Sequence, residues 1–285
     1  MEYQLIFVLL IIGHFLGDFY FQSAAMVRRK NRNTLVMLGH GCIYLASVLA
    51  PFLLLFAAPL TGWYLIFIVT LLHIIMDIVK ALWLKGKPFF KKNPLRLFVI
   101  DQSVHLLVIA LVAYFYAIDT VVAYSNATLR LGEIYASLQL GLGPWDLLCL
   151  TSLFLFLGKP ANIFIRYICG HGDEFEQGAT PSQQQTGWVL VRKISKIEDL
   201  ARRVEPAAEA DQQAGRIIGV LERYLTVILI LLGQYAAVGL AFTAKSVTRF
   251  NKIANEPDFA EQYLIGTMSS LLLAVIGAVL YNFVH

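Results

Sequence analysis

The chain has 285 residues, of which 58% are hydrophobic without counting its 20 glycines, and only 15% are charged. Soluble domains contain about 45–50% apolar residues with glycine included and about 25% charged residues. The composition therefore excludes a soluble globular enzyme, a disordered chain and a secreted disulfide-rich domain, and it leaves an integral membrane protein. The net charge of +4 gives no reason to expect a nucleic-acid partner.

Apolar segments long enough to cross a bilayer recur along the chain, since a hydrocarbon core of about 30 Å requires about 20 apolar residues per helix. They run over Tyr3–Gln22, Thr34–Ala58, Gly62–Leu84, Leu97–Ile118, Trp145–Ile168, Ile217–Phe242 and Tyr263–Val284. We therefore expect an all-α fold, a polytopic integral membrane helical bundle with about seven transmembrane helices.

Basic residues predict which loops lie in the cytoplasm. The connection over residues 24–33 holds four Lys or Arg residues and that over 85–96 holds five, whereas the connection from Asp119 to Pro144 holds Arg130 alone. Basic loops are retained on the cytoplasmic side. The pattern places residues 24–33 and 85–96 inside and the N-terminus outside.

The chain is predicted to divide into four parts. Residues 1–120 form a four-helix transmembrane core, 121–168 an external loop and the fifth helix, 169–215 a cytoplasmic loop, and 216–285 two C-terminal transmembrane helices. Within the cytoplasmic loop, Trp188–Val204 has apolar residues at helical spacing interleaved with Lys and Arg. This pattern is typical of a helix on an anionic membrane surface, and a helix packed on the protein's own cytoplasmic face would have it too.

The C-terminal part conflicts with the charge rule. Seven spans place Lys245, Arg249 and Lys252 outside, so either the positive-inside tendency fails here or one late segment is re-entrant. Nearby polar residues are expected either to form interfacial ion pairs or to contribute to a substrate path. They include Glu222, Arg223 and Glu261.

Three aspartates lie inside the first four helices, where ionisable side chains are costly and call for an explanation. Each has a histidine four residues away, in His14-Phe-Leu-Gly-Asp18, His73-Ile-Ile-Met-Asp77 and Asp101-Gln-Ser-Val-His105. Positions four apart share one helix face. The order reverses in the fourth helix, which also crosses in the opposite direction from the first and third.

This reversal places the three pairs at the same depth. At 1.5 Å per residue, each histidine lies roughly 12–16 Å and each aspartate roughly 6–10 Å from the cytoplasmic edge. His40, in the second helix, falls in the same band. The sequence therefore predicts one shared site rather than three separate pairs.

Imidazole and carboxylate ligands suit Zn, Mn or Fe, so a divalent metal is the expected cofactor. The predicted metal ligands are His14, Asp18, His73, Asp77, Asp101 and His105. Lys80 is expected to bind a phosphate or an oxyanion, or to pair with Asp77. Gln102, and with it Gln22, would orient substrate or water, and His40 would join the site. The predicted catalytic residues are therefore Lys80, His40 and Gln102. A metal-free proton relay and plain helix–helix hydrogen bonds are the alternatives.

These motifs resemble a family of bacterial inner-membrane proteins catalogued as domain of unknown function 3307. The likeness rests on the string from His14 to Gln22, on His40, on His73-x3-Asp77-x2-Lys80 and on Asp101-Gln102-x2-His105, and it covers mainly residues 1–120. The resemblance implies a multi-pass protein of the bacterial inner (cytoplasmic) membrane and no established activity. In style, the intramembrane His/Asp pattern is also similar to inner-membrane proteins described as metal-dependent hydrolases.

Three functions are therefore open. The first is a metal-dependent membrane hydrolase acting from the cytoplasmic leaflet on an amphiphilic substrate, such as a lipid-linked phosphate or amide; its partner would be a membrane lipid or a lipid-linked substrate. The second is a proton- or ion-coupled transporter that uses the His/Asp cluster. The third is a non-catalytic scaffold that recruits protein partners through residues 169–215.

Overall fold

The computed structural model describes residues 2–30, 33–55, 63–85, 93–119, 142–170 and 215–284, and the regular elements among them are all helical. Six helical stretches in this part of the chain are long and apolar enough to cross a membrane. The all-α membrane bundle is thereby confirmed, while the number of spans and the side of the N-terminus stay predictions. The predicted helix Trp188–Val204 lies outside the described residues, as does the 121–141 connection.

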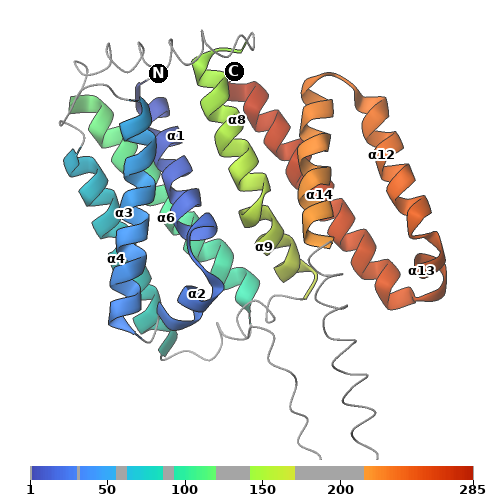
Figure 1. Cartoon of the computed structure of the whole chain (residues 1–285), viewed down its shortest axis with the longest axis horizontal. Helices are drawn as coiled ribbons and strands as arrows, with labels where there is room; N and C mark the ends of the chain where they lie inside the picture. Colours follow the sequence, from blue (N-terminus) through green and yellow to red (C-terminus); the bar gives the residue numbers. More distant parts are fainter. Residues whose placement is uncertain are drawn as a thin grey trace, which may run out of the picture.

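The elements follow one another as helices and short turns (Figure 1). In chain order they are α1 (Glu2–Phe15), the π-helical turn η1 (Leu16–Tyr20), α2 (Ala24–Lys30), α3 (Thr34–Leu55), α4 (Trp63–Lys85), α6 (Pro94–Asp119), α8 (Pro144–Leu157), α9 (Lys159–Ile168), a helix over residues 215–231, α12 (Tyr235–Thr248), α13 (Phe250–Asn255) and α14 (Pro257–Val284). Three of these helices begin on a proline, whose missing N–H costs nothing in the first helical turn.

The first four long helices form a bundle with α1 at its centre. α1 packs against α3, α6 and α8, and α4 contacts both α3 and α6. The apolar core of this bundle takes buried side chains from all four helices, among them Leu10, Tyr44, Val69 and Ile109. α1 thus presents side chains in several directions at once, and its burial positions residues on it against every neighbouring helix.

Glycines allow α1 and α3 to approach closely. A Cβ added at Gly13 would lie 2.6 Å from the Cα of Val48, and one added at Gly17 would lie 2.9 Å from a ring carbon of Tyr44. Real Cβ atoms do not approach other atoms so closely, so only glycine permits this spacing of the two helices. The close approach brings the side chains of α3 up to the C-terminal turn of α1.

The C-terminal part packs against the bundle through α8. The line of α8 and α9 is interrupted at Gly158, as the Lys159-Pro160 sequence suggests. Leu157 packs with Val227, Ala274 and Ala278, so α8, the helix over residues 215–231 and α14 share a small core. Large apolar side chains elsewhere on α6 and α14 are exposed, as expected for surfaces in contact with lipid.

The predicted single span Ile217–Phe242 is wrong, because a tight turn divides it into two helices. The first helix ends at residue 231, Gly233 has a φ of 71°, and α12 begins at Tyr235. Glycine adopts a positive φ without the steric penalty of a Cβ. Figure 1 shows α12 running back beside the first helix as the second arm of a hairpin.

The hairpin resolves the charge conflict in this part of the chain. Lys245 on α12 lies 2.5 Å from Glu222 on the first arm, measured from Nζ to Oε2. Lys245 lies on α12, Lys252 on α13 and Arg249 in the turn between them. This part of the chain lies at the end of the molecule where α2 and the C-terminus of α9 are found (Figure 1). We call this end the basic end. Of the two explanations left open for these three cations, this arrangement agrees with a late segment that turns back.

Candidate metal centre

Four histidines from four helices converge in the interior of the bundle. His14 lies on α1, His40 on α3, His73 on α4 and His105 on α6, and none of them is more than 2% exposed. The ring centroid of His73 lies 5.8 Å from that of His14, 5.3 Å from that of His40 and 4.7 Å from that of His105. His73 is therefore the centre of the cluster.

Asp18 joins the histidines from the π-helical turn η1, and such turns are frequent at functional sites. Its Oδ1 lies 3.2 Å from Nε2 of His40 and 3.2 Å from Nε2 of His73. His14 instead lies 3.3 Å from the hydroxyl of Tyr44 and 3.2 Å from Oε1 of Gln102. His14 and Asp18 therefore contact different helices: Asp18 contacts α3 and α4, and His14 contacts α3 and α6.

Asp77 forms a buried ion pair that the sequence analysis missed. Nζ of Lys30, at the end of α2, lies 2.7 Å from Oδ2 of Asp77, and the lysine is 6% exposed. In the sequence, Lys30 follows Arg28 and Arg29 and therefore resembles the other basic residues of this loop. The sequence did contain an indication of such a partner. The first four helices hold three embedded carboxylates and one embedded lysine, Lys80, so a further cation is needed to balance the charge.

Lys80 is engaged with carboxylates rather than free. Its Nζ lies 2.7 Å from Oδ2 of Asp101 and 3.8 Å from Oδ1 of Asp77. Nε2 of Gln102 donates to the same Asp101 oxygen at 3.3 Å. The three predicted catalytic residues therefore all lie beside predicted metal ligands, His40 against His73 and Asp18, and Lys80 and Gln102 against Asp101.

Tyr44 is a second residue that the sequence analysis missed. Its ring stacks on that of His73, with the centroids 3.7 Å apart and an angle of 7° between the planes. It lies four residues after His40 on α3 and so shares a helix face with it, which was the available signal. The stacked tyrosine fixes the plane of the central imidazole.

Hydrogen bonds at the outer ring nitrogens decide which nitrogens face the centre. Nδ1 of His105 donates to the backbone carbonyl of Asp101 at 2.8 Å. Nδ1 of His40 donates to the amide oxygen of Gln22 at 3.2 Å, in the amide orientation in which that oxygen also accepts from Lys30 at 3.1 Å. Metal-binding histidines usually donate their second N–H to such an oxygen. A proton on Nδ1 leaves Nε2 of each ring with its lone pair.

Several buried polar atoms of the cluster have no hydrogen-bond partner among the described residues. They are Oδ1 of Asp18, Nδ1 of His73 and Nε2 of His105. Buried polar groups are nearly always paired, so each such atom needs an explanation. Nε2 of His40 and Nε2 of His73 also face each other at 3.1 Å, and this contact requires either a proton or a cation between the two nitrogens.

The donor set fits a divalent cation in number, type and charge. Three overlapping groups hold potential ligand atoms within 4.8 Å of one another, and they contain His14, Asp18 and His73; His40, His73 and Asp77; and Asp77, Asp101 and His105. All six predicted ligands and His40 belong to these groups. With neutral histidines, the three carboxylates exceed the two lysines, Lys30 and Lys80, by one charge.

The fold and this cluster define an all-helical, multi-pass membrane protein whose first four helices enclose a buried His/Asp centre. Residues 6–130 match the model of a family described as protein of unknown function DUF3307. The matched segment includes every residue of the cluster, from His14 to His105. No curated protein and no solved structure matches the chain.

Proposed function

We propose that the His/Asp cluster binds Zn, Mn or Fe and that the protein is a metal-dependent membrane hydrolase. The observation that carries the proposal is the set of buried, unshared lone pairs at the centre. Oδ1 of Asp18 lies 3.2 Å from Nε2 of both His40 and His73 without satisfying hydrogen-bond geometry. A cation gives all three atoms a common partner and offsets the surplus carboxylate charge.

A bound divalent metal supplies an activated water near neutral pH, which is the usual requirement for hydrolysis. The residues around the centre hold its ligands in place. Gln22 and the carbonyl of Asp101 orient two imidazoles, Tyr44 supports a third, and Lys30 and Lys80 each neutralise one carboxylate. These contacts keep the donor atoms together before any ion or substrate arrives.

The proposed substrate is amphiphilic, a lipid-linked phosphate or amide that approaches from the cytoplasmic leaflet. Lys80 is the most exposed charged residue of the cluster, at 20% of its side chain, and Asp101 follows at 11%. The histidines are almost fully enclosed. An approaching anionic group would thus meet the ammonium of Lys80 first, between α4 and α6, which agrees with the role expected for this lysine.

A second candidate, a proton-coupled transporter, is favoured by the enclosure of the histidines. Imidazoles in direct contact, such as His40 and His73 at 3.1 Å, are typical of intramembrane proton relays. In that case the shared position between the two rings holds a proton rather than a metal ion. The two candidates therefore differ in what occupies a single place in the structure.

Elemental mass spectrometry of the full chain, purified in detergent without added metal or chelator, separates these candidates. We expect about one Zn, Mn or Fe per chain. Asp18→Asn should weaken metal affinity at least about tenfold, because one charge-assisted ligand contributes more than about 1.4 kcal/mol. Glu222→Gln, the same carboxylate-to-amide change outside the cluster, should retain the metal.

A hydrolase must also release phosphate from vesicles that contain phosphatidic acid or a related lipid phosphate, and must lose this activity together with the metal. If the folded wild-type protein carries no stoichiometric metal, and if proteoliposomes show a proton flux that Asp18→Asn abolishes, the hydrolase is refuted and the transporter takes its place.

A further inference from the structure

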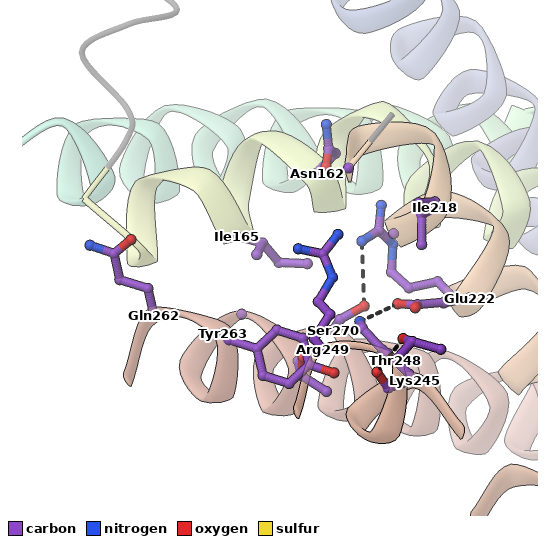
Figure 2. A pocket seen from close by; sticks show the side chains of 15 residues that line it. Asn162, Ile165, Ile218, Glu222, Lys245, Thr248, Arg249, Gln262, Tyr263 and Ser270 are labelled. Atoms are coloured by element: carbon purple, nitrogen blue, oxygen red, sulfur yellow. Dashed lines mark hydrogen bonds and ion pairs between the residues drawn. The ribbon is translucent and has the colours of Figure 1, made fainter. Parts of the chain in front are cut away.

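A cavity with charged side chains in its lining lies in the C-terminal part of the molecule, apart from the His/Asp cluster. It has a volume of about 440 Å³ and is formed by α9, the helix over residues 215–231, the end of α12 and α14. It shares no lining residue with the cluster. Figure 2 shows polar and charged side chains from these helices turned toward one another around it.

Arg223 forms the buried floor of this cavity and has no acidic partner among the residues that the structure describes. It is 2% exposed, and no carboxylate of the described residues lies within 4.0 Å of its guanidinium. Nε donates to the carbonyl of Leu157 at 2.7 Å, and the two terminal nitrogens donate to the carbonyl of Gly158 and the hydroxyl of Ser270 at 3.4 Å. A buried cation held by neutral oxygens alone leaves a positive site that favours an anion.

Two further cations reach the cavity against a single acid. Lys245 is paired with Glu222, whereas Arg249 has no described ion-pair partner and contacts the face of Phe259 at 6.0 Å. Figure 2 shows the Arg249 side chain extending across the cavity toward Ile165. The lining therefore carries a surplus of positive charge.

The remaining lining residues suit a polyatomic oxyanion such as phosphate. Thr267, Ser270 and Thr248 are among the lining residues, and three glycines leave parts of its walls without side chains. Those glycines are Gly215, Gly219 and Gly266. A Cβ at Gly215 would meet nothing within 4 Å and one at Gly219 would meet only Arg223, at 3.6 Å. The cavity thus combines guanidinium groups, an ammonium and hydroxyl donors, the groups that recognise phosphate.

The rim of the cavity continues into an apolar surface. Ile218 lines the cavity and is 44% exposed, and Ile217 and Leu221 on the same helix and Leu264 on α14 are exposed too. Further apolar side chains on these two helices are also exposed. A ligand with a charged head and an apolar chain matches this arrangement, since its head would enter the cavity and its chain would lie along the helices.

We propose that this cavity is a binding site for a phosphate-bearing anion, with Arg223 and Arg249 as the principal contacts and a lipid phosphate headgroup as the preferred form. The proposal is independent of the metal and of the hydrolase. It uses helices that follow the family-matched segment, and it explains why a buried arginine and a cluster of cations occur together at the basic end.

The test measures binding of the full chain, in dodecylmaltoside, to mixed micelles doped with phosphatidic acid, to phosphatidylcholine micelles, and to inorganic phosphate. Microscale thermophoresis provides the affinities. Arg249→Gln is the main variant, because Arg249 is only partly buried and its side chain makes no hydrogen bond to another described helix. Lys252→Gln is the matched control: it removes the same charge from the neighbouring helix α13, at a position that does not line the cavity.

We expect phosphatidic acid to bind, Arg249→Gln to weaken binding at least about tenfold as the loss of a charge-assisted contact should, and Lys252→Gln to change it less than about twofold. Binding of inorganic phosphate with the same dependence on Arg249 supports a soluble phosphate ligand instead of a lipid. Arg223→Lys, which keeps the charge but loses the planar guanidinium, should also weaken binding of phosphatidic acid. Equal binding by Arg249→Gln and Lys252→Gln, or equal binding to phosphatidylcholine, overturns the proposal.

Discussion

The two halves of the molecule each contain a short lysine–carboxylate pair, and the difference between them lies in the surroundings. Lys30 and Asp77 meet at 2.7 Å with side chains 6% and 2% exposed, and Lys245 and Glu222 meet at 2.5 Å with 21% and 25% exposed. The first pair is withdrawn from solvent inside the family-matched bundle, and the second lies at the edge of a cavity. Nearly equal distances thus represent very different electrostatic situations.

Helix packing differs in the same way between these halves. α1 and α3 approach so closely that Gly13 has no room for a Cβ, whereas Gly239 on α12 has no neighbouring heavy atom within 4 Å of the corresponding position. In the N-terminal bundle, α1 and α3 therefore pack with no space left between them at Gly13. α12 is less tightly packed at Gly239, and its C-terminal end lines the cavity, where a ligand can bind.

The largest loss of folding stability is expected when the buried Lys30–Asp77 pair is broken. Asp77→Asn leaves the ammonium of Lys30 enclosed without its counter-charge, and breaking such a pair costs about 3–5 kcal/mol of folding free energy. Thermal denaturation in detergent, with a chelator present throughout, should show a large fall of the midpoint. The double variant Lys30→Met, Asp77→Leu should recover most of it, because no uncompensated charge remains. An Asp77→Asn midpoint equal to that of wild type would contradict the burial of this pair.

An intermediate effect is expected from the two glycines. Gly13→Ala forces a methyl group to within 2.6 Å of the Val48 backbone, and overpacking of this kind costs about 1–3 kcal/mol. Gly239→Ala, the same change in the open hairpin, should be neutral or stabilise α12 by up to about 1 kcal/mol, because alanine is the better helix former. The two thermal midpoints, measured side by side, should move in opposite directions or differ clearly; equal shifts would remove the contrast in packing.

The smallest effect on stability is expected at the half-exposed pair. Glu222→Gln should cost less than about 1 kcal/mol, as partly exposed ion pairs usually do. The same change frees Lys245 for an incoming anion, so phosphatidic acid should bind a few-fold more tightly. A loss of stability as large as that of Asp77→Asn would show that the second pair is as strongly desolvated as the first.

Much of the site was readable from spacing. The i, i+4 relation of His14 with Asp18, His73 with Asp77 and Asp101 with His105 predicted a common level, and the structure brings all of these side chains into one cluster. Contacts between helices were not readable. Asp18 meets His40 and His73 rather than His14, because a π-helical turn changes the direction of its side chain.

The pattern of charges indicated which segments are basic loops, but it did not indicate which basic residue pairs with which carboxylate. Lys30 belongs to a run of three basic residues, and nothing in that run separates the one that turns inward from the two that do not. The hairpin at Gly233 was missed for a similar reason, since residues 217–242 are continuously apolar and hydropathy does not register a change of direction within an apolar run. Gly233 has a positive φ in the structure. A single glycine within an apolar run does not predict this conformation.

The amino-acid order by itself determined which segments are long and apolar enough to cross a membrane and which polar residues share a helix face, because both follow from the fixed rise and repeat of the α-helix. The tertiary structure decided which faces meet, which lysine neutralises which aspartate, and where the chain turns back to enclose a cationic cavity. Those outcomes depend on distances between segments that are far apart in the chain, and such distances are set by packing and by charge compensation in the folded bundle.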